Sequence, residues 1–236
     1  MSRHPAPAPA PAPAPARKRL LWITVTTGTL ITLLPAADRF AAVSAEHRLA
    51  DLIAGRQTAV VGTPQVSIDA FPFLLSAAEG SFSRVAVRAD AVTGRGRPVQ
   101  AAVDLKDVSE HAGSYRAASA DARFTAPFSS FGADSGPDLS LSDDGHGRLR
   151  VERQVFGLPL TITAEVRLSG RTVKVVPVAA SLAGRAVDPA GPRIQEAFAG
   201  QDRTLPKLPA GLDPRDVSVT ASGVVLYAHG DDIRLT

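Results

Sequence analysis

The chain contains no cysteine among its 236 residues. This absence excludes a disulfide framework, a thiol nucleophile and an iron–sulfur site. Aromatic residues make up only 5% of the sequence, so a core has to be packed from aliphatic and small side chains. The roughly 195 residues that follow the N-terminal region are enough for one such core.

Sequence signals of catalysis are missing as well. The five histidines are scattered, and none stands at metal-ligand spacing from another histidine or a carboxylate. There is no nucleophile elbow, phosphate-binding loop or dinucleotide-binding motif. The neighbouring carboxylates Asp231 and Asp232 would point to opposite faces of a strand, so they cannot flank one bond. The stretch Asp143–Gly147 is interpreted as a polar hairpin tip. We expect no enzymatic activity, no metal and no cofactor.

Acidic residues are absent from the first 37 positions. There the cluster Arg17-Lys18-Arg19 directly precedes an uncharged run, Leu20–Leu34. A cationic cluster before about fifteen uncharged residues is typical of an export signal or a membrane anchor. As a helix, residues 20–37 would reach about 27 Å, enough for a thin hydrocarbon core. The small-residue pattern Val43-Ser44-Ala45 leaves cleavage of a signal peptide as the alternative.

The charge of the rest of the chain is nearly balanced. Residues 1–37 hold four of the 26 basic residues and none of the 23 acidic ones, which leaves 22 basic against 23 acidic side chains. Such a domain has no cationic excess with which to neutralise phosphates, so we expect no nucleic-acid partner. The high pI instead reflects membrane topology.

These features divide the chain into three parts. Residues 1–19, in which proline and alanine alternate, are predicted to be a disordered cytoplasmic tail. Residues 20–37 are the transmembrane anchor or signal, and residues 38–236 are one extracytoplasmic domain. The predicted location is the cell membrane, with a single pass and the C-terminal domain in the periplasm or cell envelope.

The domain is predicted to begin with an amphipathic helix, Asp38–Ala54. Asp38 is a candidate N-cap after Pro35, and Gly55 is a candidate C-terminal stop. The apolar stripe of this helix, which Glu46 interrupts, includes large and small residues: Val43, Leu49, Ala50, Leu52 and Ile53.

From Val66 onward the hydrophobic period changes from 3.6 to 2, which is typical of strands. Turn signals separate about seven to nine such runs, and the short connections favour antiparallel pairing. Helical interruptions are predicted around Pro127–Gly132 and near Pro189–Ala199. The predicted fold class is α+β, with the long N-terminal helix packed against one curved antiparallel β-sheet.

One face of the predicted sheet consists mostly of alanine and valine. Small side chains fill space poorly by themselves. Either helices cover this face closely, or it leaves a groove that an acyl chain could occupy. The sequence pattern leaves both alternatives open.

Large apolar residues gather at Phe71, Phe73, Leu74 and Leu75. Pro72 cannot donate a ladder hydrogen bond, so this segment leaves the sheet or runs along its edge. Beside a membrane anchor it could act as a lipid gate or an interfacial wedge. The alternative is a core plug that closes the end of the sheet.

Two further groups have a structural and a lipid-related interpretation. Leu205, Leu208 and Leu212 stand between prolines, which predicts an extended crossing that either packs on the core or contacts lipid. Four arginines near the second predicted strand either meet anionic headgroups or form a solvated strand face: Arg84, Arg88, Arg95 and Arg97.

The stretch Val66–Leu75, followed by Gly80 and Val85–Val87, resembles the V-x-I-x-G-F-P-F-L signature of the LmeA-like phospholipid-binding family of actinobacteria. Similar residues occur upstream at Asp38-Arg39 and downstream at Leu205–Leu212, so the resemblance spans most of residues 36–236. Ala70 stands where the family usually has glycine. If this position needs a positive φ, Ala70 would be strained.

The resemblance implies a tubular lipid-binding or BPI-like fold, in which a long helix packs into a highly curved sheet. It implies binding of a phospholipid or a phosphatidylinositol mannoside-like glycophospholipid in the cell envelope. In mycobacterial relatives this role is linked to mannan elongation of lipomannan. The resemblance therefore implies support of lipoglycan or mannan elongation, or lipid transfer, with envelope glycosyltransferases as candidate partners. The candidate lipid-binding residues are Phe71, Phe73, Leu74, Leu75, Leu49, Ile53, Leu205 and Leu208. A membrane-tethered scaffold or interaction domain without a lipid ligand is the alternative.

Overall fold

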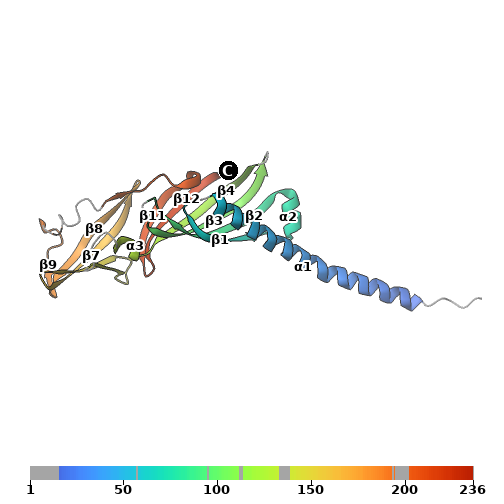
Figure 1. Cartoon of the computed structure of the whole chain (residues 1–236), viewed down its shortest axis with the longest axis horizontal. Coiled ribbons are helices and arrows are strands. Elements are labelled where there is room, and N and C mark those ends of the chain that lie inside the picture. Colours follow the sequence, from blue (N-terminus) through green and yellow to red (C-terminus); the bar gives the residue numbers. More distant parts are fainter. Residues whose placement is uncertain are drawn as a thin grey trace, which may run out of the picture.

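The computed structural model describes residues 16–56, 58–94, 96–111, 114–132, 139–192, 194 and 202–235, with side chains from Pro35 onward. Its first element, α1, is one helix over Ala16–Arg56. The N-terminal half of α1 projects away from the rest of the molecule, and its C-terminal half lies beside the first strands (Figure 1).

The sequence-based start of this helix at Asp38 is wrong, because α1 continues through Pro35. A proline inside a helix removes one backbone hydrogen bond. Leucines and alanines, which favour helix, flank Pro35 on both sides and support its continuation. The predicted stop at Gly55 is correct to within one residue, since the helix ends at Arg56.

The strands nearest to α1 form sheet A, in which all neighbours are antiparallel and the order is β1-β2-β3-β4-β12-β11. In this order its strands are Val60–Asp69, Ser81–Val92, Pro98–His111, Ser114–Ala126, Gly223–Leu235 and Asp213–Thr220. The chain thus builds four consecutive strands and returns at its C-terminus to complete the same sheet.

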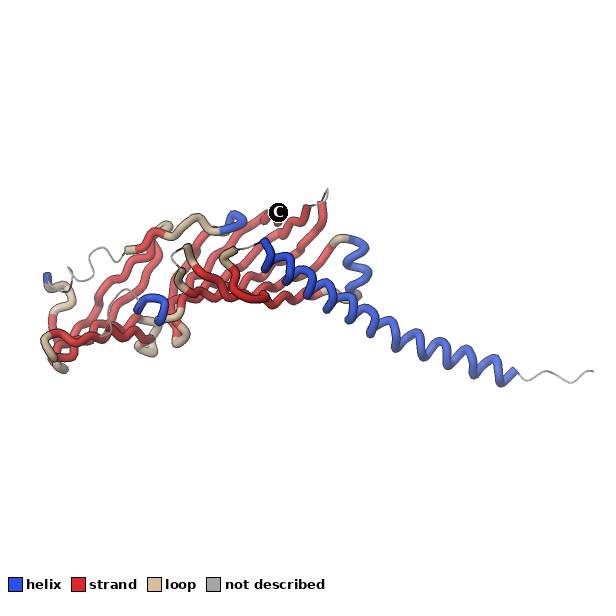
Figure 2. The backbone as a smooth tube through the Cα atoms, in the orientation of Figure 1, coloured by secondary structure: helices blue, strands red, loops and turns tan. Residues whose placement is uncertain are grey.

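The remaining strands form sheet B, also antiparallel, with the order β10-β8-β7-β6-β5 and β9 paired to β8. The strands β5 to β10 are Leu139–Asp143, Leu149–Val155, Leu158–Ser169, Thr172–Leu182, Arg185–Val187 and Arg203–Thr204. The two sheets meet where β11 contacts β7, and they give the molecule an elongated shape (Figure 2).

The described strands therefore form two sheets, where the sequence predicted one. The α+β class and the antiparallel pairing are confirmed. The single sheet was expected because short connections link most runs. In the structure the series of consecutive neighbouring strands ends at β4. This strand lies between β3 and the C-terminal strand β12, and β5 belongs to the other sheet.

Three short helical elements complete the described fold: α2 over Phe73–Glu79, α3 over Ser129–Gly132 and η1 over Pro209–Gly211. The interruption predicted at Pro127–Gly132 is α3. Most of the helix predicted near Pro189–Ala199 lies outside the described residues. Within the described residues, no helix combines the length and the apolar character needed to cross a membrane.

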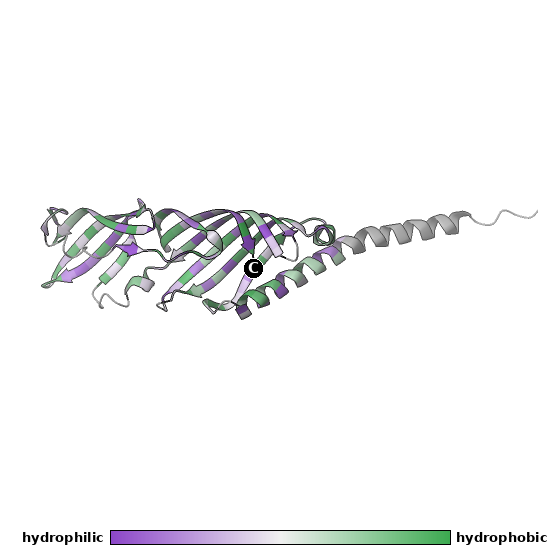
Figure 3. Cartoon of the chain, turned by 90° about the horizontal axis from the view of Figure 1, so that it is seen from above, coloured by the Kyte–Doolittle hydropathy of each residue, from purple (hydrophilic) through white to green (hydrophobic). Residues whose placement is uncertain are grey.

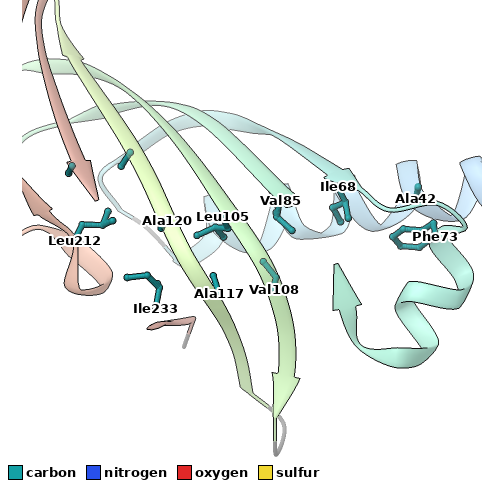
Figure 4. Close-up of a cluster of buried hydrophobic side chains, with 12 residues drawn as sticks. Ala42, Ile68, Phe73, Val85, Leu105, Val108, Ala117, Ala120, Leu212 and Ile233 are labelled. Carbon is teal, nitrogen blue, oxygen red and sulfur yellow. The ribbon is translucent and has the colours of Figure 1, made fainter. Parts of the chain in front are cut away.

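One face of sheet A forms the main core, and we call it the inner face. Hydropathy alternates along the strands, as their period of two requires (Figure 3). Cross-strand pairing aligns one buried row on this face: Ile68, Val85, Leu105 and Ala120. Ala42 of α1 and Phe73 of α2 join this cluster at one end, and Leu212 and Ile233 join it at the other (Figure 4).

Candidate functional site

Two carboxylates of α1 attach this helix to the start of the sheet. Asp38 is buried, and its Oδ2 and Oδ1 accept hydrogen bonds from the backbone N–H groups of Phe73 (2.9 Å) and Leu74 (2.8 Å). Glu46 Oε1 accepts a bond from the N–H of Ile68 (2.9 Å), on the edge strand β1. Asp38 thus caps α2, whose preceding residue Pro72 offers no side-chain cap.

This capping explains why the pattern around Asp38 is misleading. An aspartate after a proline indicates a local N-cap, but the N–H groups that it binds are 35 and 36 residues away. Glu46, which interrupted the predicted apolar stripe, has a similar use. Its carboxylate satisfies a donor on an edge strand that would otherwise lack a backbone partner.

The Phe-Pro-Phe-Leu segment divides into a buried and an exposed part. Phe73 is buried, with its ring centroid 6.0 Å from that of Phe82, as the core-plug alternative requires. Phe71 is 84% exposed, and Leu74 and Leu75 are about half exposed. We call these last three residues the α2 patch. Exposed apolar groups of this size are what the wedge alternative requires.

The α2 patch borders a surface depression of about 480 Å³ between α1 and β1. Phe71 and Ala70 line it from the segment before α2, and Arg39 and Asp38 line it from α1. Ala70 is not among the described non-glycine residues with positive φ, so the strain considered for this position is absent. The depression therefore combines one exposed aromatic ring with a guanidinium group.

Along β2, β3 and β4, burial on the inner face of sheet A falls from the row of Val85 to the row of Ala89, whereas Val217 of β11, which pairs with Leu226, stays buried. The row that starts at Ile68 is buried. Two rows further along each strand, the paired residues are half-buried, and we call them the open row: Ala89, Ala101, Phe124 and Leu226. The helix covers the first part of the apolar face and leaves the open row partly accessible.

Sheet B carries an aliphatic face of its own. Cross-strand pairing aligns Leu141, Val151, Ile162, Ala180 and Val187 in one row. Ile162 and Ala180 at its centre are buried, whereas the outer members are half-buried. Val166 and Val175 form a further half-buried pair. The described helix that contacts sheet B, α3, is four residues long and packs on the edge strand β5.

The other predicted lipid-binding residues are separated along the molecule. Leu49 of α1 is half-buried and packs on the core of sheet A, and Ile53 is half-buried one turn further on. Leu208 packs on the same core from the crossing before β11. Leu205 is half-buried beside sheet B, and its N–H donates to the carbonyl of Arg171 (2.8 Å). The structure therefore groups Leu49 and Leu208 with Phe73, but not with Leu205.

The outer face of sheet A is polar and rich in ion pairs. Arg84 pairs with Asp104, and Lys106 Nζ lies 2.8 Å from Asp121 Oδ2. His229 Nδ1 lies 2.7 Å from the other oxygen of Asp121. Hydrogen bonds from Lys106 and His229 lower the pKa of Asp121, and the bond to Asp121 raises the pKa of His229.

Of the four arginines considered for headgroup contact, Arg84 is therefore held in an ion pair and Arg95 lies outside the described residues. Arg97 is half-buried and Arg88 is exposed. The polar tip at Asp143–Gly147 is confirmed as a hairpin turn, in which Asp144 Oδ1 accepts from two backbone N–H groups. Within the described residues, no three acidic or histidine side chains are grouped so that they could hold a metal ion.

Sequence reasoning missed the open row and the burial gradient. Ala89 and Ala101 look like any small residues on an alternating strand. Their significance depends on the register that places them opposite each other and on where α1 ends. The exposed Phe40 of α1 was also missed, although a phenylalanine on the charged side of a helix was a usable signal.

Comparison with known protein families gives a match over most of the chain. The family model described as LmeA-like phospholipid-binding matches residues 36–229. Neither a curated protein nor a solved structure matches the chain. The matched range includes the packed half of α1, the Phe-Pro-Phe-Leu segment, sheet B and nearly all of sheet A. The chain therefore belongs to the LmeA-like phospholipid-binding family.

Proposed function

We propose that this protein binds phospholipid by burying acyl chains against the open row of sheet A and the aliphatic face of sheet B. The observation that carries this proposal is the fall in burial along an apolar face that α1 covers only in part. Each methylene group removed from water contributes about 0.8 kcal/mol, so a chain of ordinary length gains several kcal/mol from such a face. Small side chains such as Ala89 and Ala101 leave room for it.

The headgroup class is a second part of the proposal. We infer a phospholipid or a phosphatidylinositol mannoside-like glycophospholipid, used in mannan elongation of a lipoglycan or in lipid transfer beside envelope glycosyltransferases. The family description supports the phospholipid. A tubular lipid-binding fold is consistent with a helix packed on one end of a long antiparallel framework.

We further propose that residues 20–37 anchor the chain in the cell membrane, with the domain outside the cytoplasm. The cationic cluster and the uncharged run after it support this topology. The exposed α2 patch supports contact with the membrane surface, because transfer of apolar side chains from water into the membrane interface lowers the free energy.

Organic extraction of the purified full chain, followed by lipid mass spectrometry, tests the function. We expect phospholipid to copurify in a fixed ratio and to exchange with labelled phosphatidylinositol vesicles. A chain that purifies free of lipid and takes up none from the vesicles contradicts the proposal and supports the tethered scaffold.

A pair of neighbouring alanines locates the lipid. Ala101→Leu adds bulk to the open row, whereas Ala102→Leu adds the same bulk to the outer face. We expect Ala101→Leu to reduce bound lipid at an unchanged Tm, because a half-buried position tolerates a larger side chain. Ala102→Leu should bind like the wild type. Equal lipid content in the two variants would exclude the open row as the binding surface.

A further inference from the structure

The outer face of sheet A contains a surface pocket of about 320 Å³ beside the edge strand β1. The geometry points to a binding site for a phosphate-type oxyanion, held between the guanidinium groups of Arg88 and Arg123. The lining residues on which this inference rests are Thr63, Gln65, Arg88, Asp90, Ala102 and Arg123. Ala89 and Ala101 also line the pocket, but the side chains of Arg88 and Arg123 point to the face opposite the open row, so the inference does not depend on the proposed lipid function.

A bulge in β1 opens this pocket. The pairing of β1 with β2 is regular from Gln65 to Asp69 but shifts between Val61 and Gln65. Gly62, with a φ of 75°, allows the chain to leave the ladder here. The bulge places Thr63 in the wall of the pocket, so a hydroxyl and the Gln65 amide face the same space as Arg88.

The two arginines lie in one cross-strand row. Arg88 of β2 pairs with Ala102 of β3, and Ala102 pairs with Arg123 of β4. Side chains in such a row point to the same face, and two strand spacings separate the arginine Cα atoms by about 10 Å. Alanine between them leaves the space above it empty. Two long guanidinium side chains can therefore converge on one anion and offer it paired N–H donors.

Neither arginine has an ion-pair partner in the part of the chain that the structure describes. The nearby Asp104 is bound to Arg84, and Asp121 is bound to Lys106 and His229. The guanidinium carbon of Arg123 lies 5.3 Å from the ring centroid of Tyr227, within the range of a cation–π contact, which still leaves the guanidinium N–H groups able to donate to an anion. On the same face, Arg84, Lys106 and Arg116 are each paired with a carboxylate.

The pocket has one carboxylate in its lining, Asp90, two residues after Arg88 on the same strand. Two guanidinium groups against one carboxylate leave a net positive site. Thr63 and Gln65 add neutral donors and acceptors, and these suit the hydroxyl or ester oxygens beside a phosphate. The ligand class is thus a phosphate, either free or as part of a headgroup.

Isothermal titration of the full chain in detergent with inorganic phosphate, and then with glycerol phosphate, tests the site. We expect saturable binding that weakens with salt, and a loss of about tenfold or more in affinity for Arg88→Gln and for Arg123→Gln. Arg150→Gln removes an exposed arginine from sheet B and is the matched control, with unchanged affinity expected.

Ala102→Glu provides a variant that retains both arginines. Its carboxylate would lie between them and occupy the site from within, so phosphate binding should disappear while Tm is unchanged or raised. Failure of both probes to bind the wild type, or equal affinity in wild type, Arg88→Gln and Ala102→Glu, overturns the inference.

The two phosphate sources are distinguished by competition. Displacement of inorganic phosphate by phosphatidic acid vesicles, but not by phosphatidylcholine vesicles, identifies a lipid headgroup as the ligand. Binding of inorganic phosphate that such vesicles do not displace identifies a soluble phosphate. The lipid content of two variants distinguishes this site from the proposed function. Ala101→Leu should lose bound lipid and retain phosphate binding, whereas Ala102→Glu should lose phosphate binding and retain bound lipid.

Discussion

At the scale of single residues, Asp38 joins α1 to α2. Asp38→Ala would leave the buried N–H of Phe73 without a partner, which typically costs about 1–3 kcal/mol. We expect a lower Tm and a smaller free energy of unfolding in urea. Asp38→Asn retains one acceptor oxygen and should lose less. Asp51→Ala, an exposed aspartate on the same helix, is the control; equal losses for Asp38→Ala and Asp51→Ala would contradict this role.

His229 makes the stability of sheet A depend on pH. The hydrogen bond to Asp121 raises the pKa of His229 above its ordinary value of about 6.5. Its contribution is therefore present in full below about pH 6.5 and is lost as the pH rises through the folded-state pKa. Asp121, with its lowered pKa, acts in the opposite sense, and its contribution is lost only as the solution becomes strongly acidic.

The corresponding measurement compares wild type with His229→Gln. We expect the difference in Tm between them to be larger at about pH 5.5 than at about pH 8.5. The exposed His146 at the hairpin tip is the control, and His146→Gln should show no such trend. A Tm difference that stays constant or grows toward alkaline pH would exclude His229 as the group responsible.

At the scale of elements, the α2 patch predicts where the domain touches the membrane. Phe71→Trp in a Trp22→Phe background leaves one indole, because Trp22 is the single tryptophan of the chain. We expect brominated lipids to quench this indole in reconstituted vesicles. Phe156→Trp is the matched control, since Phe156 is 99% exposed at the turn between β6 and β7. Equal quenching at the two positions would contradict insertion of the α2 patch.

The strands and helices show which features local patterns can predict. Alternation of apolar and polar residues from Ile162 to Leu168 identified β7, because successive side chains of a strand point to opposite faces of the sheet. The start of α1 was missed because Asp38 and Pro35 together imitate a local cap. The division into two sheets was missed because pairing of β4 with β12 joins residues about 100 positions apart, which no local period reveals.

At the scale of the whole molecule, sheet A separates two chemistries on its two faces. The neighbours Ala101 and Ala102 are alike in sequence, yet the side chain of one belongs to the open row and that of the other lies between Arg88 and Arg123 on the opposite face. The sequence predicted an alternating sheet and a cluster of apolar residues at Phe71–Leu75. It could not predict either proposed site, because both depend on register across several strands and the open row depends also on the extent of α1.

The long helix α1 links this domain to the N-terminal segment without a break. If residues 20–37 are a membrane anchor, the full chain of 24.5 kDa should sediment with membranes and resist alkaline carbonate. Signal-peptide cleavage would instead shorten it by about 4–5 kDa and release it. Leu30→Arg should weaken membrane retention, because an arginine at the centre of a span costs about 2.5–3.5 kcal/mol. Leu52→Arg places the same charge on an exposed position of α1 and should remain in the membrane fraction, so release of both variants alike would contradict an anchor at residues 20–37.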